Sequence, residues 1–193
     1  MKIAPIDRDQ TRRRLVRDRE RLRSLLSRRP EGEPRRLWLH PCYQAAWLHR
    51  WSHFHFARGN RLRARSLWHL NLLLTGVDIS PISDLDGGLV LLNPAGTVIV
   101  GKAGENLTVH GRVGIGGGLS PDDIGAGPGL PVLGVDVTLG FGACVLGPVR
   151  VGSRTVIEPG VIVHRDLPDD TVERSPASRR VRAGSTGAAG GES

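Results

Sequence analysis

The stretch VLGVDVTLGFGACVLGPVRVGSRTVIEPGVIV, residues 132–163, decides the fold. Aliphatic side chains recur in it at every sixth position, and a glycine directly follows three of them. The aliphatic positions are Leu133, Leu139, Val145, Val151, Ile157 and Val163, and the glycines are Gly134, Gly140 and Gly152. A period of six is typical of a β-solenoid, in which three short strands and three tight turns form one triangular coil of about 18 residues. The stretch therefore predicts a mainly β fold, a parallel β-helix whose interior these aliphatic side chains fill and whose turns the glycines permit.

The same period extends upstream, with a slip and one interruption. It is readable at Ile79, Leu85 and Leu91 and again at Leu107 and Val113. The segment GGGLSPDDIGAGPGLP, residues 116–131, is too rich in Gly and Pro to form a strand. We expect it to be a loop extruded from the coil, where a rigid scaffold commonly carries function; a disordered insertion is the alternative. The β-helix is thus expected over 76–168, followed by a C-terminal loop and flexible tail over 169–193.

The residues before this array show helical spacing instead. Apolar and aromatic residues at Ala46, Trp47, Trp51 and Phe54 predict a helix over 43–58, which Gly59 ends. A second helix is expected over 61–74, before Gly76. Together they predict a helical cap over 37–75, packed beside the repeats.

Residues 1–36 form a basic arm that holds most of the formal net charge of +8. Twelve arginines and Lys2 stand there against six acidic residues, and the two signs alternate. A charge-laced helix over 10–29 is one interpretation, and a loosely ordered or polyanion-binding arm is the other. No aromatic residue lies among these arginines, so the base-stacking signature of nucleic-acid binding is missing. We expect no nucleic-acid partner.

Compartment and membrane signals are weak in this chain. Cys42 and Cys144 lie in a helix start and a repeat, a context that does not indicate a disulfide framework. The N-terminus has no apolar signal region, and every apolar run is far shorter than the roughly 18–20 residues that span a bilayer. A cytoplasmic protein without a membrane partner is expected.

Five segments, in order, carry a resemblance that covers most of the chain from His40 to about Val181. They are HRWSH at 49–53, TGVDISP at 75–81, VGIGGG at 113–118, LGFGACVLGPVRVG at 139–152 and SPAS at 175–178. No single segment is specific, but the ordered set resembles the serine O-acetyltransferase family of hexapeptide-repeat acyltransferases.

The resemblance implies left-handed coils, a homotrimer, and acetyl-CoA or another acyl-CoA bound as co-substrate in a groove between subunits. It also implies a possible hexamer through the N-terminal helices, a small-molecule acceptor and no metal. The handedness comes from the resemblance alone, because ordinary crossovers between parallel strands are right-handed. The positions it assigns to the CoA site are Gly116, Gly117, Phe141, Gly142, Pro159 and Arg165.

On the acceptor side the chain departs from the family. Where members carry the histidine that acts as general base, the segment LLNPAG at 91–96 has Asn93, and a neutral amide cannot take a proton. Where longer members carry Arg-His-Pro for the serine carboxylate and the reaction centre, this chain has GLP at 129–131. Asp78, which corresponds to the acid that orients the family's histidine, is retained.

On the donor side two small residues of the pantetheine channel are replaced by Phe141 and Pro159. Phenylalanine fills space, and proline lacks the N–H that bonds pantetheine. Weakened CoA binding is the expectation.

His110 is the candidate replacement base, because it follows Asn93 by close to one coil and both residues are expected to face the same groove. A surface or packing histidine is the alternative. Other residues also have two interpretations: Asp122 and Asp123 as loop bases or turn formers, and His164 with Arg165 as CoA-phosphate ligands or a solvated rim. For His49 and His53 the choice is between a metal site and a structural role.

Three functions from different classes follow. The first is an acyl-CoA-dependent O- or N-acyltransferase, acetyl by the resemblance, that acts on an acceptor other than free serine, with Asn93, His110 and Asp78 at its catalytic site. The second is a non-catalytic trimer that serves as scaffold or partner. The third is a repurposed enzyme that uses the intersubunit groove without CoA.

Overall fold

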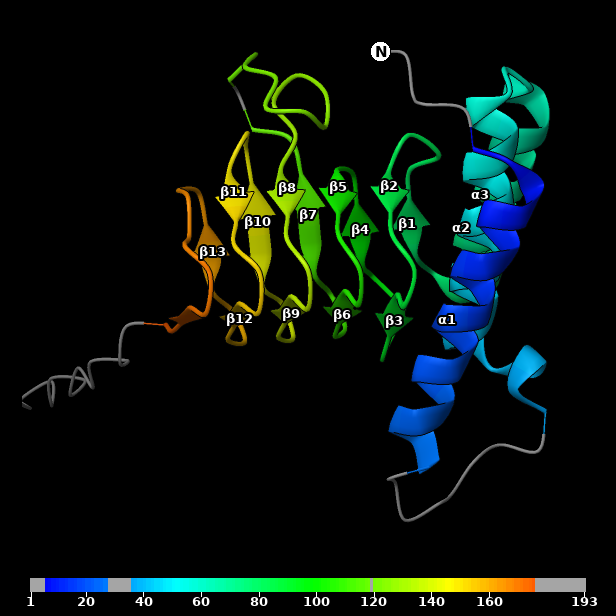
Figure 1. Cartoon of the computed structure of the whole chain (residues 1–193), viewed down its shortest axis with the longest axis horizontal. Helices are drawn as coiled ribbons and strands as arrows, with labels where there is room; N and C mark the ends of the chain where they lie inside the picture. The colour runs from blue at the N-terminus through cyan, green and yellow to red at the C-terminus, as the bar shows by residue number, and fades with distance from the viewer. Residues whose placement is uncertain (1–5, 28–35, 119, 176–193) are drawn as a thin grey trace, which may run out of the picture.

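The computed structural model describes residues 6–27, 36–118 and 120–175 of the 193-residue chain. A three-sided parallel β-helix makes up most of it, and the helices gather at the N-terminal end of the solenoid (Figure 1). The mainly β fold with a helical N-terminal region is confirmed. The tail, with most of the SPAS segment, lies outside the described residues.

The helical region has four elements. They are α1 (Arg8–Ser27), the 3-10 helix η1 (Leu37–Leu39), α2 (Pro41–Ala57) and α3 (Arg61–Thr75). Helix α2 begins earlier than predicted because proline is tolerated in a first turn, and the His40 side chain accepts a hydrogen bond from the Cys42 N–H. Helix α3 ends where Gly76 adopts a left-handed conformation, with φ of 69°.

The strands form three parallel sheets, named here as faces A, B and C of the prism. Face A contains β1 (Asp78–Ile79), β4 (Val98–Ile99), β7 (Gly114–Gly116), β10 (Cys144–Leu146) and β13 (Ile162–Val163). Face B contains β2 (Asp84–Leu85), β5 (Lys102–Ala103), β8 (Val132–Leu133) and β11 (Arg150–Val151). Face C contains β3 (Val90–Leu91), β6 (Thr108–Val109), β9 (Thr138–Leu139), β12 (Val156–Ile157) and β14 (Val172–Glu173). The slip in the period is a long turn between β3 and β4, followed by a short one between β4 and β5.

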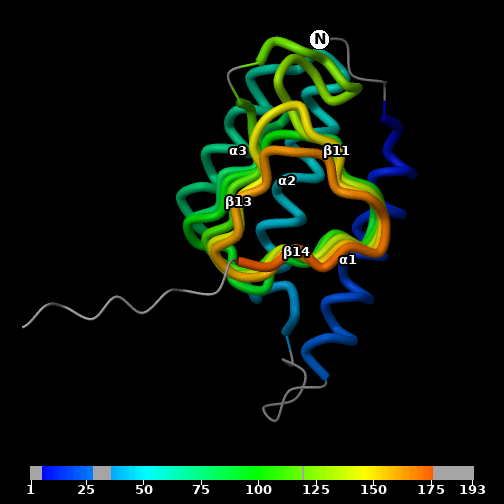
Figure 2. The backbone as a smooth tube through the Cα atoms, turned by 90° about the vertical axis from the view of Figure 1, so that its left-hand side faces the viewer, coloured from blue at the N-terminus to red at the C-terminus, as the bar shows by residue number. Residues whose placement is uncertain are grey.

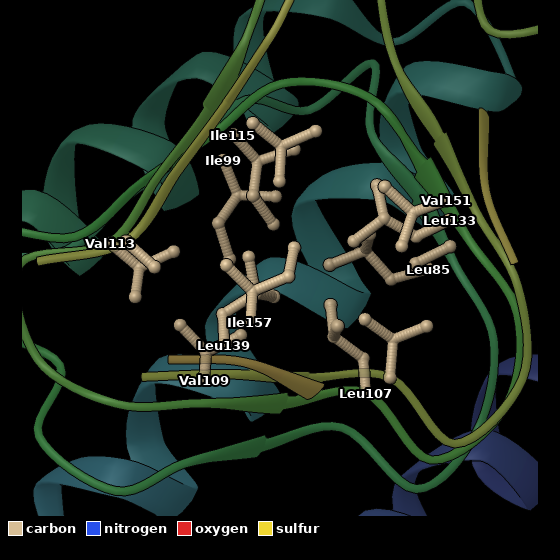
Figure 3. Close-up of a cluster of buried hydrophobic side chains, with 14 of the residues drawn as sticks. Leu85, Ile99, Leu107, Val109, Val113, Ile115, Leu133, Leu139, Val151 and Ile157 are labelled. Atoms are coloured by element: carbon tan, nitrogen blue, oxygen red, sulfur yellow. The ribbon is translucent and has the colours of Figure 1, made fainter. Parts of the chain in front are cut away.

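The interior of the prism is a continuous aliphatic core (Figure 3). Leu139, Val145 and Ile157 are fully buried, and Val151 is 2% exposed. Each such side chain contributes roughly 1.5–3 kcal/mol by burial. Helix α2 crosses the open end of the prism and closes it, because its small residues Ala45 and Ala46 belong to the same core (Figure 2).

The glycines of the period have a different role from the one predicted. A Cβ on Gly134, Gly140 or Gly152 would lie 2.3–2.6 Å from atoms of the next coil, so the close approach of coils requires glycine there. The left-handed turn conformation falls two residues later, at Asp136, Gly142 and Arg154.

Helix α1 is an ordered part of the fold whose arginines bind the solenoid. Arg14 donates to the carboxylates of Asp84 and Asp86 at 2.8 and 2.7 Å. Arg21 donates to the Gly88 carbonyl and the Thr108 hydroxyl, both at 2.7 Å. On the face of α1 that meets the coils, the arginines are therefore neutralised or hydrogen-bonded by the solenoid.

A buried ion pair joins α1 to α2, and Arg50 extends the contact to the first coil. The Arg50 guanidinium donates to both oxygens of Asp18, at 2.9 and 3.0 Å, and the two side chains are 2% and 1% exposed. Arg50 also donates to the Asp86 carbonyl at 2.7 Å. The HRWSH segment thus acts structurally here.

Candidate active site

The candidate site lies along one edge of the prism, called here the C–A corner, where each coil turns from face C to face A. Asn93, His110, Phe141 and Pro159 occupy this corner in four successive coils. Asp78 begins β1 on the adjoining face. The fold therefore brings the three candidate catalytic residues and half of the candidate CoA residues to one edge.

Asn93 and the Phe141 ring meet over Gly111. A Cβ on Gly111 would lie 3.2 Å from both Asn93 Cβ and Nδ2, and 3.0 Å from Phe141 Cε2. A larger residue at position 111 would therefore require one of these side chains to shift by a few tenths of an ångström. Phe141 is 47% exposed, so its ring covers the corner from outside and does not enter the core.

His110 is half-buried at the same corner, and its side chain has no hydrogen bond or ion pair within the described residues. Its N–H donates to the Leu139 carbonyl at 3.0 Å, which holds the backbone in the ladder. The register pairs Leu91 with Val109, so His110 lies beside Leu92 and Asn93 lies beside Gly111. The two candidates are therefore offset by one residue and are not directly stacked.

Arg112 is a residue of this corner that the sequence reasoning missed. Its guanidinium lies 6.0 Å from the centroid of the Phe141 ring, and its Cγ would be 3.6 Å from a Cβ on Gly96, in the Asn93 turn. It adopts a left-handed conformation with φ of 59°, where Gly142 and Gly160 stand in later coils. The sequence offered one signal for Arg112: it stands at a turn position where the later coils have glycine.

Asp78 is hydrogen-bonded to the helical cap. Its Oδ1 accepts a hydrogen bond from the Trp68 indole N–H at 2.7 Å. Trp68 belongs to α3, so the helical cap fixes the orientation of this carboxylate.

The remaining candidate CoA residues lie at a different edge, the A–B corner, where coils turn from face A to face B. Gly116 ends β7, and Gly117 lies beside the end of the extruded loop. Arg165 follows β13 and donates to Glu173 at 2.8 Å. One chain alone does not unite these residues with Phe141, Gly142 and Pro159.

The extruded loop between β7 and β8 is held by its own hydrogen bonds. Asp123 Oδ1 accepts from the N–H groups of Gly125 and Gly127 at 2.8 and 3.0 Å, and these bonds lower the pKa of Asp123. Asp122 Oδ2 accepts from the Ser120 hydroxyl at 2.7 Å. Both carboxylates thus shape the turn.

His49 and His53 lie inside the helical region. Burial lowers the pKa of His49 well below its ordinary value, with a further contribution from Arg50. Burial also lowers the pKa of His53, whose Nδ1 lies 3.0 Å from the Pro81 carbonyl oxygen. Among the described residues no group of three or more His, Cys, Asp or Glu side chains is arranged to hold a metal ion.

The described helices also include none that is long and apolar enough to cross a membrane.

Comparison with known proteins gives a consistent result, although no protein-family model matches the chain. The chain is 32% identical over 139 residues to the serine acetyltransferase of Mycobacterium tuberculosis, which covers 70% of this chain and 58% of that protein. It is 32% identical over 134 residues to the Helicobacter pylori serine acetyltransferase, covering 68% and 76%. The chain thus spans under two thirds of the first relative's length and about three quarters of the second's.

Solved structures share the architecture. The crystal structure of Neisseria gonorrhoeae serine acetyltransferase superposes with a TM-score of 0.76 at 27% identity, over 90% of this chain and 66% of that chain. This shared fold confirms the predicted left-handed parallel β-helix.

Proposed function

Because the chain belongs to the serine acetyltransferase family of hexapeptide-repeat acyltransferases, we propose that it transfers an acyl group, acetyl by relationship, from acyl-CoA to an acceptor other than free serine. One observation carries the proposal. The C–A corner contains an imidazole, His110, that has no side-chain partner among the described residues; it lies in the coil beside Asn93, which stands where the family's base is expected.

In this mechanism His110 is the general base. Neutral imidazole accepts the proton of an acceptor hydroxyl, or of an amine that arrives uncharged, as its oxygen or nitrogen attacks the thioester carbonyl. The tetrahedral intermediate collapses, the C–S bond breaks, and the imidazolium returns the proton to the CoA thiolate. Asp78 accepts a hydrogen bond from Trp68, which fixes the orientation of this carboxylate, so in this proposal it does not position His110.

The trimer is part of the proposal. Faces A and C, which flank the C–A corner, expose Val98, Leu146, Ile162, Val156 and Val172, with Ile162 61% exposed. A threefold assembly that covers these aliphatic side chains would set the A–B corner of one chain against the C–A corner of its neighbour. That arrangement unites Gly116 and Gly117 with the corner residues. Exposed Leu62 and Leu73 on α3 offer a further contact for a hexamer.

Phe141 favours the second candidate, a non-catalytic trimer. Its ring lies along the corner over Gly111, where the resemblance places the pantetheine chain, and Pro159 offers no N–H in the next coil. If CoA still binds, it does so mainly through phosphate contacts to arginines such as Arg112, and that binding is salt-sensitive.

Calorimetry with CoA and an acceptor panel test the proposal together. We expect weak CoA binding that weakens further between low and high salt, and release of free CoA thiol with at least one amine or alcohol. His110→Ala should reduce that turnover by roughly 10²–10⁴-fold while CoA affinity is retained. Absence of CoA binding would contradict the transferase and favour the non-catalytic or repurposed trimer; turnover that survives His110→Ala would remove the proposed base.

A further inference from the structure

A pocket of about 580 Å³ opens between α3, the A–B corner and the extruded loop. We propose that this pocket binds the oxyanion group, carboxylate or phosphate, of a ligand that also has an apolar portion, and that this ligand is the acceptor. The identification as acceptor rests on the proposed function; the binding itself does not.

Two arginines that form no ion pair with any residue the structure describes give the pocket its charge. Arg61 and Arg65 line it, one helical turn apart on α3, and neither forms an ion pair within the described residues. By contrast, Arg14 and Arg17 of α1 are paired with carboxylates. Like charges four residues apart on a helix repel each other, and an anion between them removes that repulsion.

The helix itself adds to the positive potential. Arg61 is the first residue of α3, whose N-terminus carries the positive end of the macrodipole. The Ser80 hydroxyl lines the same pocket and makes no hydrogen bond among the described residues, so it can donate to an oxyanion.

The other walls are apolar. Phe56, Val100 and Leu130 line the pocket, and the loop contributes only Pro128 and Leu130. All the charge thus comes from α3, and a ligand that fits both walls is amphiphilic: an oxyanion at one end and a hydrocarbon body against the loop.

Trp68 links this pocket to the candidate active site. Its ring forms part of the pocket wall, and its indole N–H is bonded to Asp78 at 2.7 Å. A ligand anchored by the two arginines therefore lies against the side chain that orients Asp78, at the start of face A. This contact makes the pocket an acceptor subsite and not an isolated cavity.

Arginine-to-glutamine variants of α3 supply the test, because Arg63 lies on the same helix, is exposed and does not line the pocket. Phenylacetate, phenyl phosphate and the neutral benzyl alcohol are titrated calorimetrically into the full chain. We expect an anionic probe to bind with salt-dependent affinity and benzyl alcohol to bind at least tenfold more weakly. The preferred anion then identifies the oxyanion as a carboxylate or a phosphate. The double variant R61Q/R65Q should lose at least tenfold in affinity, whereas R63Q should stay within about twofold.

Equal losses in R63Q and in R61Q/R65Q would overturn the proposal, because they would show diffuse electrostatics. So would equal binding of benzyl alcohol, or no binding of either anion. Failure of the proposed function has a separate signature: the anion binds as described, but none of the acceptors tested leads to acetyl-CoA consumption. Turnover with a neutral acceptor that R61Q/R65Q leaves unchanged would overturn only the identification of the pocket as the acceptor subsite.

Discussion

The carboxylate of Asp18 is shared by two parts of the molecule. It accepts from the Arg50 guanidinium and from the N–H groups of Gly88 and Leu89, at 2.8 and 2.7 Å. Asp18→Ala leaves the Arg50 charge buried and unpaired, so we expect the free energy of unfolding to fall by about 3–5 kcal/mol. Asp9→Ala, on the exposed side of α1, should change it by less than about 0.5 kcal/mol. Urea unfolding measures both, and similar values for the two variants would contradict the role of Asp18.

Buried His49 predicts acid sensitivity. Burial holds its pKa below the ordinary 6.5, so the folded chain keeps it neutral where the unfolded chain takes up a proton. Stability is therefore present above about pH 6.5 and is lost as pH falls below it, by up to about 1.4 kcal/mol per pH unit for each such histidine. His53 acts in the same direction. His49→Leu should flatten the dependence between about pH 6.5 and 5.5, measured by urea unfolding; an unchanged slope would contradict the assignment.

At this scale the sequence predicted some site residues and missed others. Asn93 and His110 could be proposed from their positions near one coil apart, and the structure brings both to the C–A corner. Their one-residue offset follows from the spacing, because Leu91 and the Val109 that pairs with it are 18 residues apart, whereas His110 follows Asn93 by 17 residues. Arg112 and the bond from Trp68 to Asp78 were invisible, since both depend on how the turn and α3 lie against the coils.

At the scale of the elements, the same substitution is expected to have opposite effects at inward-facing and outward-facing positions of the coils. Val151 in β11 is 2% exposed and faces the core, whereas Val135 lies in a turn and is 39% exposed. Val151→Asp buries a carboxylate in a dry interior at a cost of at least about 3 kcal/mol. Because each coil supports the next, β structure and the mass of the proposed trimer should be lost together. Val135→Asp should retain both. Circular dichroism and light scattering report the outcome, and an intact Val151→Asp trimer with an unchanged melting temperature would contradict the β-helix.

The elements themselves were largely predictable from spacing. The six-residue period located every strand from Leu133 to Val163, because each of these strands places one aliphatic side chain in the core at that spacing. The role of the glycines was not, since spacing cannot separate a left-handed turn from a close approach between coils. Whether α1 is ordered could not be predicted either, because its partners Asp84, Asp86 and Thr108 lie far away in the sequence.

The whole molecule combines the family's scaffold with site residues that differ from those the resemblance predicts. The family fold, the closed core and the helical cap are intact, but the acceptor edge has Asn93 for a base and Gly129 with Leu130 in the loop. Restoring one residue by Asn93→His is not expected to create serine turnover, because the loop still lacks a cation for the carboxylate. Under the proposed function, we therefore expect substrate choice to depend on the C–A corner, the A–B corner and the helical cap.

The measurement that tests this account most directly is acetyl-CoA consumption by the wild-type chain with free L-serine, compared with a panel of amines and alcohols that includes anionic ones. Losing a positioned base costs roughly 10²–10⁴-fold, and losing the carboxylate clamp weakens acceptor binding further. We therefore predict serine turnover close to the background hydrolysis of acetyl-CoA, with clear turnover of another acceptor. Robust acetylation of free L-serine would contradict the account and show that the changed corner still performs the reaction for which its relatives are named.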